Sequence, residues 1–295
     1  MTQKPYRDYG TWIREQFPFR VQKIAIDAGF TCPNRDGKVG LGGCVFCDNA
    51  TFNPSYCNKS KTITDQLEEG KAFFARKYPD MKYLAYFQAY SNTYAPLSVL
   101  KERYEEALNV KDIVGIVIAT RPDCIDDEKL DYLAELNKCT FLILEYGVET
   151  CNDETLRIIN RGHTFECSKS AIIKTHERGI LVGAHFILGL PGEDRNEIMR
   201  QAKIISSLPI DILKLHQMQI IKGTRLAQGI TPPPHTFTVE EYIAIIADFI
   251  KISRKDIIYE RFVSQSPKDL LIAPNWGLKN HELTNLLNNR LARKK

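Results

Sequence analysis

The feature of this sequence that most constrains its fold is a regular alternation, from Lys23 onward, of short apolar runs with longer amphipathic segments. Six runs have the length of strands, and their interiors are nearly continuous apolar sequences such as IVGIVIA and FLILEYGV. Strands of this kind are typical of a parallel sheet whose two faces are both covered. The six expected strands are residues 23–27, 83–88, 113–119, 141–148, 181–188 and 212–217.

The segments between the strands have the spacing of amphipathic helices, in which apolar residues recur every three or four positions. They predict helices at residues 65–77, 97–109, 126–137, 165–178 and 193–206. Strands that alternate with helices imply right-handed crossovers, which curl a parallel sheet into a full or partial barrel. We therefore expect an α/β fold, a partial (β/α)6 TIM-like barrel, over residues 23–230.

Two extensions flank this core. Residues 1–22 form an N-terminal extension, and residues 231–295 form a C-terminal one that opens with Pro232, Pro233 and Pro234. The C-terminal segment carries helical patterns at 238–253 and 281–292 and a strand-like stretch at 257–262. Because a segment of this size is small for a core of its own, we expect it to pack on the barrel.

Composition limits the environment in which such a chain works. Of 295 residues, 43% are hydrophobic and 26% are charged, and no apolar run approaches the roughly 18 residues that cross a bilayer. The N-terminus is polar and has no apolar signal core. We therefore expect a cytoplasmic protein without a membrane segment, whose cysteines are reduced.

The net charge of +4 is concentrated at the end of the chain. Between residues 279 and 295, five basic residues face a single acid, Glu282, and this excess equals the charge of the whole chain. A basic tail can attract the phosphate backbone of a nucleic acid. The alternative is a solvated helix end, where cations are favourable near the C-terminus.

A cysteine-rich loop follows the first expected strand, within residues 31–66. Cys32, Cys44 and Cys47 form a C-x11-C-x2-C pattern, and four glycines lie between Cys32 and Cys44. Glycine tolerates conformations that let a backbone wrap closely around a bound group. Thiolates at this spacing suit a soft metal, and long loops at the carboxyl end of a barrel strand usually carry function.

Two metal centres are compatible with this loop. A structural zinc site needs a fourth ligand, for which Cys57 is available, whereas three cysteines on a four-iron cluster leave one iron open to a substrate or cofactor. The position of the loop at the mouth of a barrel favours the iron–sulfur cluster. The four remaining cysteines are isolated and are interpreted as ordinary thiols: Cys124, Cys139, Cys151 and Cys167.

Four motifs together resemble the radical S-adenosylmethionine (radical SAM) superfamily. They are the cysteine loop, Thr120-Arg-Pro-Asp123, Asn160-Arg-Gly-His163 and Gly189-Leu-Pro-Gly192-Glu193. Within the superfamily the chain is similar to the branch near Elp3 and the oxygen-independent coproporphyrinogen oxidases. Residues 86–96 and 264–276 look closer still to the YtqA/YhcC (MnmL-like) group, and this resemblance runs over nearly the whole chain.

The resemblance implies two cofactors, a [4Fe-4S] cluster and S-adenosyl-L-methionine (SAM). By this resemblance Cys32, Cys44 and Cys47 hold three irons, and SAM binds the fourth. Reductive cleavage of SAM then supplies a 5′-deoxyadenosyl radical, which needs an electron donor such as flavodoxin or ferredoxin. Phe46 matches the apolar position against adenine, with a core aromatic as the alternative.

The resemblance also implies SAM contacts outside the cysteine loop. Glu149 matches the residue that binds the ribose, and Arg161 matches the arginine that pairs with the carboxylate. The second strand ends at Gln88 and Tyr90 without the glycine-rich turn of relatives, which leaves the contact to the SAM amino group open. The other expected contacts are Thr120, Ile187 and Gly189.

Two histidines are candidates for the catalytic side of the site. His185 shares a strand face with Ile187 and Gly189, and Lys214 shares one with His216. Parallel strands seldom direct such side chains inward without a role, although a lone histidine is more often a satisfied core residue. His185 and His216 are therefore predicted only as candidates.

Three functions remain open at this point. The resemblance to the MnmL-like group implies a radical SAM enzyme that modifies the wobble uridine of tRNA, taking a carboxymethylaminomethyl side chain to aminomethyl. The second hypothesis keeps the radical chemistry but gives it a small-molecule or protein substrate. The third is a zinc-binding barrel without catalysis, which would use Cys57 as the fourth ligand.

Overall fold

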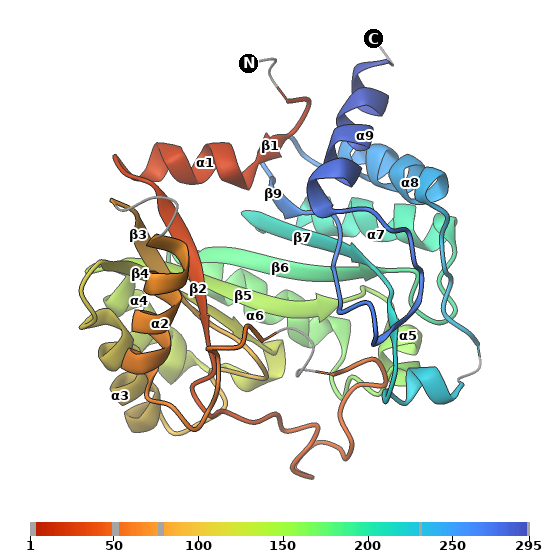
Figure 1. Cartoon of the computed structure of the whole chain (residues 1–295). Coiled ribbons are helices and arrows are strands. Elements are labelled where there is room, and N and C mark those ends of the chain that lie inside the picture. Colours follow the sequence, from red (N-terminus) through yellow and green to blue (C-terminus); the bar gives the residue numbers. More distant parts are fainter. Residues whose placement is uncertain (1–3, 49–52, 76–79, 230–231, 294–295) are drawn as a thin grey trace.

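The computed structural model describes residues 4–48, 53–75, 80–229 and 232–293. Its centre is an eight-stranded sheet in the order β1-β9-β7-β6-β5-β4-β3-β2, and every neighbouring pair is parallel. Figure 1 shows the sheet curving into a half-barrel with helices outside it. Its strands are β1 (Arg7–Asp8), β2 (Val21–Ile26), β3 (Lys82–Phe87), β4 (Ile113–Thr120), β5 (Phe141–Glu149), β6 (Leu181–Leu188), β7 (Ile212–Gln217) and β9 (Ile258–Arg261).

The expected fold class is confirmed, because all six predicted strands occur in one parallel sheet, β2 to β7. The strand-like stretch at 257–262 is β9, which pairs with β7 and so extends the sheet beyond the predicted core. The N-terminal segment adds β1 beside β9. The sheet therefore runs across both domain boundaries drawn from the sequence, and those boundaries remain predictions.

Most of the helices pack on the outer face of the sheet, where their apolar stripes join one large core. Capping side chains fix several starts: Asp126, Thr164 and Asp194 each accept a hydrogen bond from a backbone N–H of the first turn. The helices are α1 (Tyr9–Gln16), α2 (Ile63–Ala75), α3 (Leu97–Leu108), α4 (Asp127–Asn137), α5 (Asp153–Ile158), α6 (Phe165–Glu177), α7 (Arg195–Ser207), α8 (Val239–Ile252) and α9 (Asn280–Ala292). Residue 77, the predicted end of α2, lies outside the described residues.

Helix α1 closes the amino end of the barrel. Trp12 and Ile13 are buried in one apolar cluster with strand residues that include Leu84, Val117 and Ile143. This apolar layer fills the interior as side chains do in closed barrels. In the described part of the chain the barrel is thus filled at its amino end, which leaves the carboxyl end of the strands for a site.

The C-terminal segment completes the carboxyl mouth. The tyrosine hydroxyl of Tyr242 on α8 donates to Phe262 O at 2.7 Å, and a capping box of Thr238 and Glu241 starts this helix. Beyond β9 the chain returns through β10 (Leu271–Ala273), which pairs antiparallel with β8 (Ile220–Ile221). This return brings residues 261–265 to the edge of the barrel opening. No helix within the described residues is long and apolar enough to span a membrane.

Candidate functional site

A cavity of about 530 Å³ opens at the carboxyl ends of the strands, where barrel enzymes hold their sites. Its wall combines the cysteine loop after β2 with the ends of β3 to β7 and with the segment that follows β9. Twelve of the thirteen site residues expected from the sequence line it: Cys32, Cys44, Cys47, Phe46, Gln88, Tyr90, Thr120, Glu149, Arg161, His185, Ile187 and His216. One site is thus built from segments far apart in the sequence.

The thirteenth residue, Gly189, lies outside the cavity wall as far as the chain is described. Strand β6 ends at Leu188, and the turn that follows gives Gly189 a φ of 90°. Its carbonyl oxygen accepts a hydrogen bond from His235 N at 2.9 Å, and a side chain here would meet His235 and Phe237. The glycine allows this close packing of the C-terminal segment, and a contact to SAM at Gly189 stays a prediction.

The cysteine loop is held in place by its own backbone. Arg35 N donates to Cys32 O at 2.8 Å, and Cys47 N donates to Cys44 O at 3.0 Å. Between them, Gly43 N donates to Asn34 O at 2.8 Å while Gly43 has a φ of 76°, a conformation that favours glycine. These turns bring the three thiols of the loop to one side of the same cavity.

Polar groups surround the thiol of Cys44. Arg161 Nη1 lies 3.5 Å from Cys44 Sγ, and Asn34 Nδ2 lies 3.8 Å from the same sulfur. Asn160 ties this turn to the loop, because its Nδ2 donates to Gly43 O at 2.8 Å. N–H donors and a cation are the partners that a thiolate ligand needs in a buried site.

Cys57 lies elsewhere. It is buried in the core beneath the outer helices, beside Asp27, and it does not line the cavity. Among the described residues no three His, Cys, Asp or Glu side chains are close enough to bind a single metal ion. Cysteines that bind a cubane each hold a different iron and therefore lie farther apart. This arrangement fits a cluster bound by three cysteines better than a four-cysteine zinc site.

Arg161 joins the cysteine loop to the end of β5. Its guanidinium donates to Gly147 O and lies 3.5 Å from Glu149 Oε1, so the two charged side chains are paired. Burial lowers the pKa of Arg161, but the effects of Cys44 and Glu149 are larger together, and the net result is a raised pKa. The Nε atom of Arg161 and Nη1 of Arg121 are buried beside the cavity without a hydrogen-bond partner in the described residues. These N–H groups are free to bind an anionic group of a ligand.

The turn after β3 has no glycine, and an asparagine fixes it instead. Asn92 Nδ2 donates to the carbonyl oxygens of Phe87, Ala89 and Ala119, at 3.2, 2.9 and 2.8 Å. Tyr90 adopts a left-handed φ of 62° within this turn. Gln88 and Tyr90 are thereby presented to the cavity.

Thr120, Phe46 and Ile187 complete the predicted wall. Thr120 is buried and shares a 2.6 Å hydrogen bond with Thr93, which fixes its hydroxyl. Phe46 is half-buried and packs against an apolar cluster that includes Ile187. Phe46 therefore contacts the core and also lines the cavity, and its contact with adenine stays a prediction.

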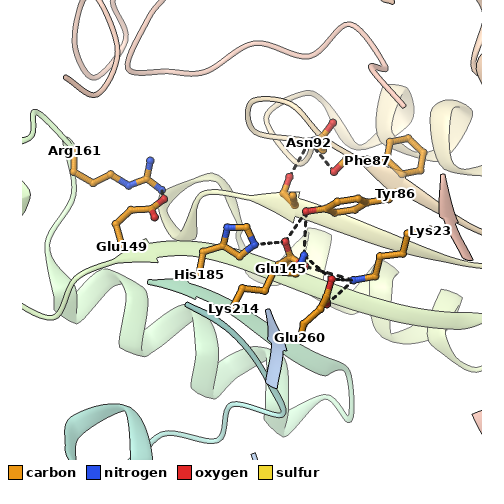
Figure 2. A network of polar contacts seen from close by, with 11 residues as sticks. Lys23, Tyr86, Phe87, Asn92, Glu145, Glu149, Arg161, His185, Lys214 and Glu260 are labelled. Carbon is orange, nitrogen blue, oxygen red and sulfur yellow. Dashed lines mark hydrogen bonds and ion pairs between the residues drawn. The ribbon is translucent and has the colours of Figure 1, made fainter. Parts of the chain in front are cut away.

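The floor of the cavity is a buried network of charges (Figure 2). Glu145 of β5 is 1% exposed, and its Oε2 lies 2.5 Å from Lys214 Nζ of β7. Lys214 also lies 3.2 Å from Glu260, which in turn binds Lys23 at 2.6 Å. Tyr86 donates to Glu145 Oε1 at 2.7 Å. Two cations and two carboxylates thus compensate one another inside the barrel, as buried charges require.

His185 stands between this network and the cavity. Its Nε2 lies 2.6 Å from Glu145 Oε1, although the two groups are not well aligned for a hydrogen bond. Burial outweighs the nearby carboxylate and lowers the pKa of His185. For Glu145, burial is outweighed by Lys214, His185 and Lys23, which hold its pKa well below the usual range. At neutral pH Glu145 is therefore ionised and His185 is neutral.

The sequence places Lys214 on an inward strand face, but four members of the site were not predicted: Lys23, Tyr86, Glu260 and Arg261. Lys23 shares a strand face with the apolar residues Val21 and Ala25 on β2, and this was an available signal that it points inward. Glu260 and Arg261 gave no such signal. Both reach the interior because the pairing of β7 and β9 is irregular, a feature that appears only in the folded sheet.

Fold and site together define a parallel α/β half-barrel with a polar, three-cysteine cavity at its carboxyl mouth. Residues 32–203 match the radical SAM superfamily, and residues 210–293 match the radical SAM C-terminal domain. The YtqA protein of Bacillus subtilis is 38% identical over 291 residues, which are 98% of this chain and 90% of YtqA. The chain belongs to the radical SAM superfamily.

Two further relatives place the chain within the superfamily. A tRNA uridine(34) acetyltransferase of Dehalococcoides mccartyi is 28% identical over 171 residues, which are 54% of this chain and 36% of that protein. The solved structure of Methanocaldococcus infernus Elp3 with an N-terminal deletion has a TM-score of 0.66 at 18% identity, covering 93% of this chain and 63% of the Elp3 chain. The Elp3 likeness shows the shared fold. Because radical SAM enzymes use a [4Fe-4S] cluster and SAM, the cofactor prediction is confirmed.

Proposed function

We propose that this radical SAM enzyme binds its [4Fe-4S] cluster through Cys32, Cys44 and Cys47 and modifies the wobble uridine of tRNA. The observation that carries the first part is the placement of the cysteines. Of the eight cysteines, these three line the cavity in the described structure, and all three lie at the carboxyl mouth of the barrel. With SAM bound, the reduced cluster supplies the electron that generates a carbon-centred radical.

Several residues of the wall suit SAM. The orphan N–H groups of Arg161 and Arg121 can bind its carboxylate, because charge-assisted hydrogen bonds favour such buried arginines. Glu149 can accept hydrogen bonds from ribose hydroxyls. Phe46 and Ile187 offer an apolar surface to adenine. Gln88, Tyr90 and Thr120 supply polar groups at the turn after β3 and at the end of β4.

The substrate is proposed to enter beside His185 and His216, whose side chains face the cavity from β6 and β7. His216 Nδ1 lies 3.0 Å from Gln217 O, and a carbonyl oxygen can only accept, so the proton of this ring is on Nδ1. Its Nε2 therefore carries a lone pair and can accept a hydrogen bond or a proton. We assign His216 and neutral His185 to the reacting end of the substrate.

Support for a tRNA substrate comes from the relatives and from charge. The similarity to a tRNA uridine(34) acetyltransferase spans about half of this chain, and the chain resembles Elp3 in fold. Helix α9 and its end carry Arg290 and Arg293, although Lys294 and Lys295 of the basic tail lie outside the described residues. The proposed reaction takes a carboxymethylaminomethyl side chain to aminomethyl by breaking the bond between the amine nitrogen and the carboxymethyl carbon. Loss of a hydrogen atom from that carbon to the 5′-deoxyadenosyl radical, return of one electron to the cluster and addition of water would release the two-carbon group as glyoxylate, with SAM converted to methionine and 5′-deoxyadenosine. The proposal places the enzyme in the cytoplasm, with flavodoxin or ferredoxin as the electron donor.

The experiment is a nucleoside profile of tRNA from a strain that lacks the gene, measured by mass spectrometry. We expect the carboxymethylaminomethyl nucleoside to accumulate and the aminomethyl nucleoside to disappear. A copy with Cys139→Ala, at an exposed thiol, should restore the profile, and a copy with Cys44→Ala should not. An unchanged wobble-uridine profile would reject tRNA and leave a small-molecule or protein substrate for the same radical chemistry.

A further inference from the structure

One cation in the cavity wall has no counter-charge. Arg261 ends β9, is half-buried and lines the cavity. Within the described ranges it forms no hydrogen bond and no ion pair, and its Nε atom is fully buried without a partner. A buried N–H without a hydrogen-bond partner is unfavourable, so the Nε atom of Arg261 indicates a ligand that accepts its hydrogen bond.

The charges around Arg261 do not supply that partner. Glu145, which lines the same cavity, and Glu260, which precedes Arg261 on β9, are already engaged by Lys214 and Lys23 (Figure 2). The other cavity arginines differ, because Arg121 binds Asp123, Arg161 binds Glu149, and Arg35 is exposed. Arg261 is therefore a net positive charge at the edge of a neutral network.

The position of Arg261 brings it close to the histidines. Lys214 of β7 is its partner in the sheet register, and His216 follows two residues later on the same face. Burial, and then the charge of Arg261, lower the pKa of His216 to about 3. His216 is thus neutral, with a lone pair on Nε2, and it adds no positive charge of its own.

We propose that Arg261 and His216 form a subsite for a carboxylate that lies next to an N–H group, as in an N-substituted glycine. The guanidinium binds the carboxylate, and Nε2 of His216 accepts a hydrogen bond from the neighbouring nitrogen. One guanidinium compensates one negative charge, so a monocarboxylate fits this place better than a phosphate dianion. The subsite rests on the proposed function, since a carboxymethylaminomethyl side chain contains this group.

The first experiment compares two tRNAs, one with the carboxymethylaminomethyl group and one with a methylaminomethyl group that lacks the carboxylate. Wild-type enzyme, loaded with cluster and SAM, should bind the first about ten- to hundred-fold more tightly, as expected for a charge-assisted pair. Arg261→Met should remove this preference, Arg261→Lys should keep part of it, and Arg200→Met on the surface of α7 should keep all of it. The affinity for SAM should stay unchanged in all three.

The second experiment separates the subsite from the tRNA proposal. N-methylglycine is titrated calorimetrically into the same loaded protein. We expect Arg261→Met to weaken the binding of N-methylglycine about ten-fold or more and Arg200→Met to leave it intact. This result supports the subsite even if no tRNA is modified. Failure of wild-type protein to bind N-methylglycine, or equal binding by Arg261→Met, overturns the subsite even if the nucleoside profile changes as proposed.

Discussion

Replacing Lys214 by methionine tests the buried charge network most sharply. Lys214 is 3% exposed and contacts Glu145 at 2.5 Å and Glu260 at 3.2 Å. Without Lys214, the ammonium group that remains near Glu145 is that of Lys23, at 4.0 Å. Glu260 keeps its 2.6 Å contact to Lys23. Breaking one side of a buried pair costs about 3–5 kcal/mol. We expect Lys214→Met to lower the free energy of unfolding by that amount at pH 7.

The pH dependence follows from the pKa of Glu145, which Lys214 helps to hold well below its usual range against the effect of burial. In the wild type, the stability that this carboxylate contributes is present at neutral pH and is lost as pH falls through its lowered pKa. In Lys214→Met burial dominates, the pKa of Glu145 rises, and the carboxylate takes up a proton at a higher pH. The deficit of the variant should therefore be largest near pH 7 and should shrink toward pH 4.

The assay is urea unfolding of cluster-loaded protein at several pH values, in a double-mutant cycle with Glu145→Gln. The double variant should be more stable than the sum of the single effects predicts, by about 2 kcal/mol, because the two side chains are in contact. Lys138→Met, which removes an exposed ion pair with Glu135, should change the stability by less than about 0.5 kcal/mol. Additive single effects would show that Lys214 and Glu145 do not stabilise one another.

Two further predictions concern stability. Gly189→Ala should lower the free energy of unfolding by about 2 kcal/mol or more in denaturant titrations, because φ is 90° and the new methyl group meets His235. An unchanged free energy of unfolding would show that the segment around His235 does not pack against Gly189. His216 has a pKa of about 3 in the folded protein, so the unfolded state takes up its proton first below pH 6.5. The free energy of unfolding should then fall by up to about 1.4 kcal/mol for each unit by which the pH is lowered from 6.5 to 3. His216→Asn should flatten this slope in unfolding titrations. A slope that stays the same in the variant would mean that His216 is charged in the folded protein.

The sheet was predictable because its strands are buried on both faces. Burial on two sides leaves apolar runs such as that of β4, which identify a strand without knowledge of its neighbours. Helix α1 and strand β1 were missed for the opposite reason. They are only eight and two residues long, and α1 is stabilised by packing Trp12 and Ile13 beneath the barrel, which no local pattern encodes.

The residues of the site also divide into those that the sequence could predict and those that it could not. The cysteine loop and the residues at strand ends were predictable, because carboxyl ends of parallel strands meet at one edge. The network beneath them was not, since Lys23 and Glu260 lie 237 positions apart and meet only when the first and last strands of the barrel approach. Gly189 was expected in the wall from the resemblance, on the same strand face as His185 and Ile187, but the chain turns directly after Leu188. The alternation of side chains between the two faces of a strand holds only as far as the strand continues.

The central claim is that Cys32, Cys44 and Cys47 hold an iron–sulfur cluster. The most direct measurement is the iron, sulfide and zinc content of anaerobically purified protein, for wild type, Cys44→Ala, Cys57→Ala and Cys139→Ala. We predict about four iron and four sulfide in the wild type, the same in Cys57→Ala and Cys139→Ala, and loss of both in Cys44→Ala. Stoichiometric zinc that disappears in Cys57→Ala would contradict the account.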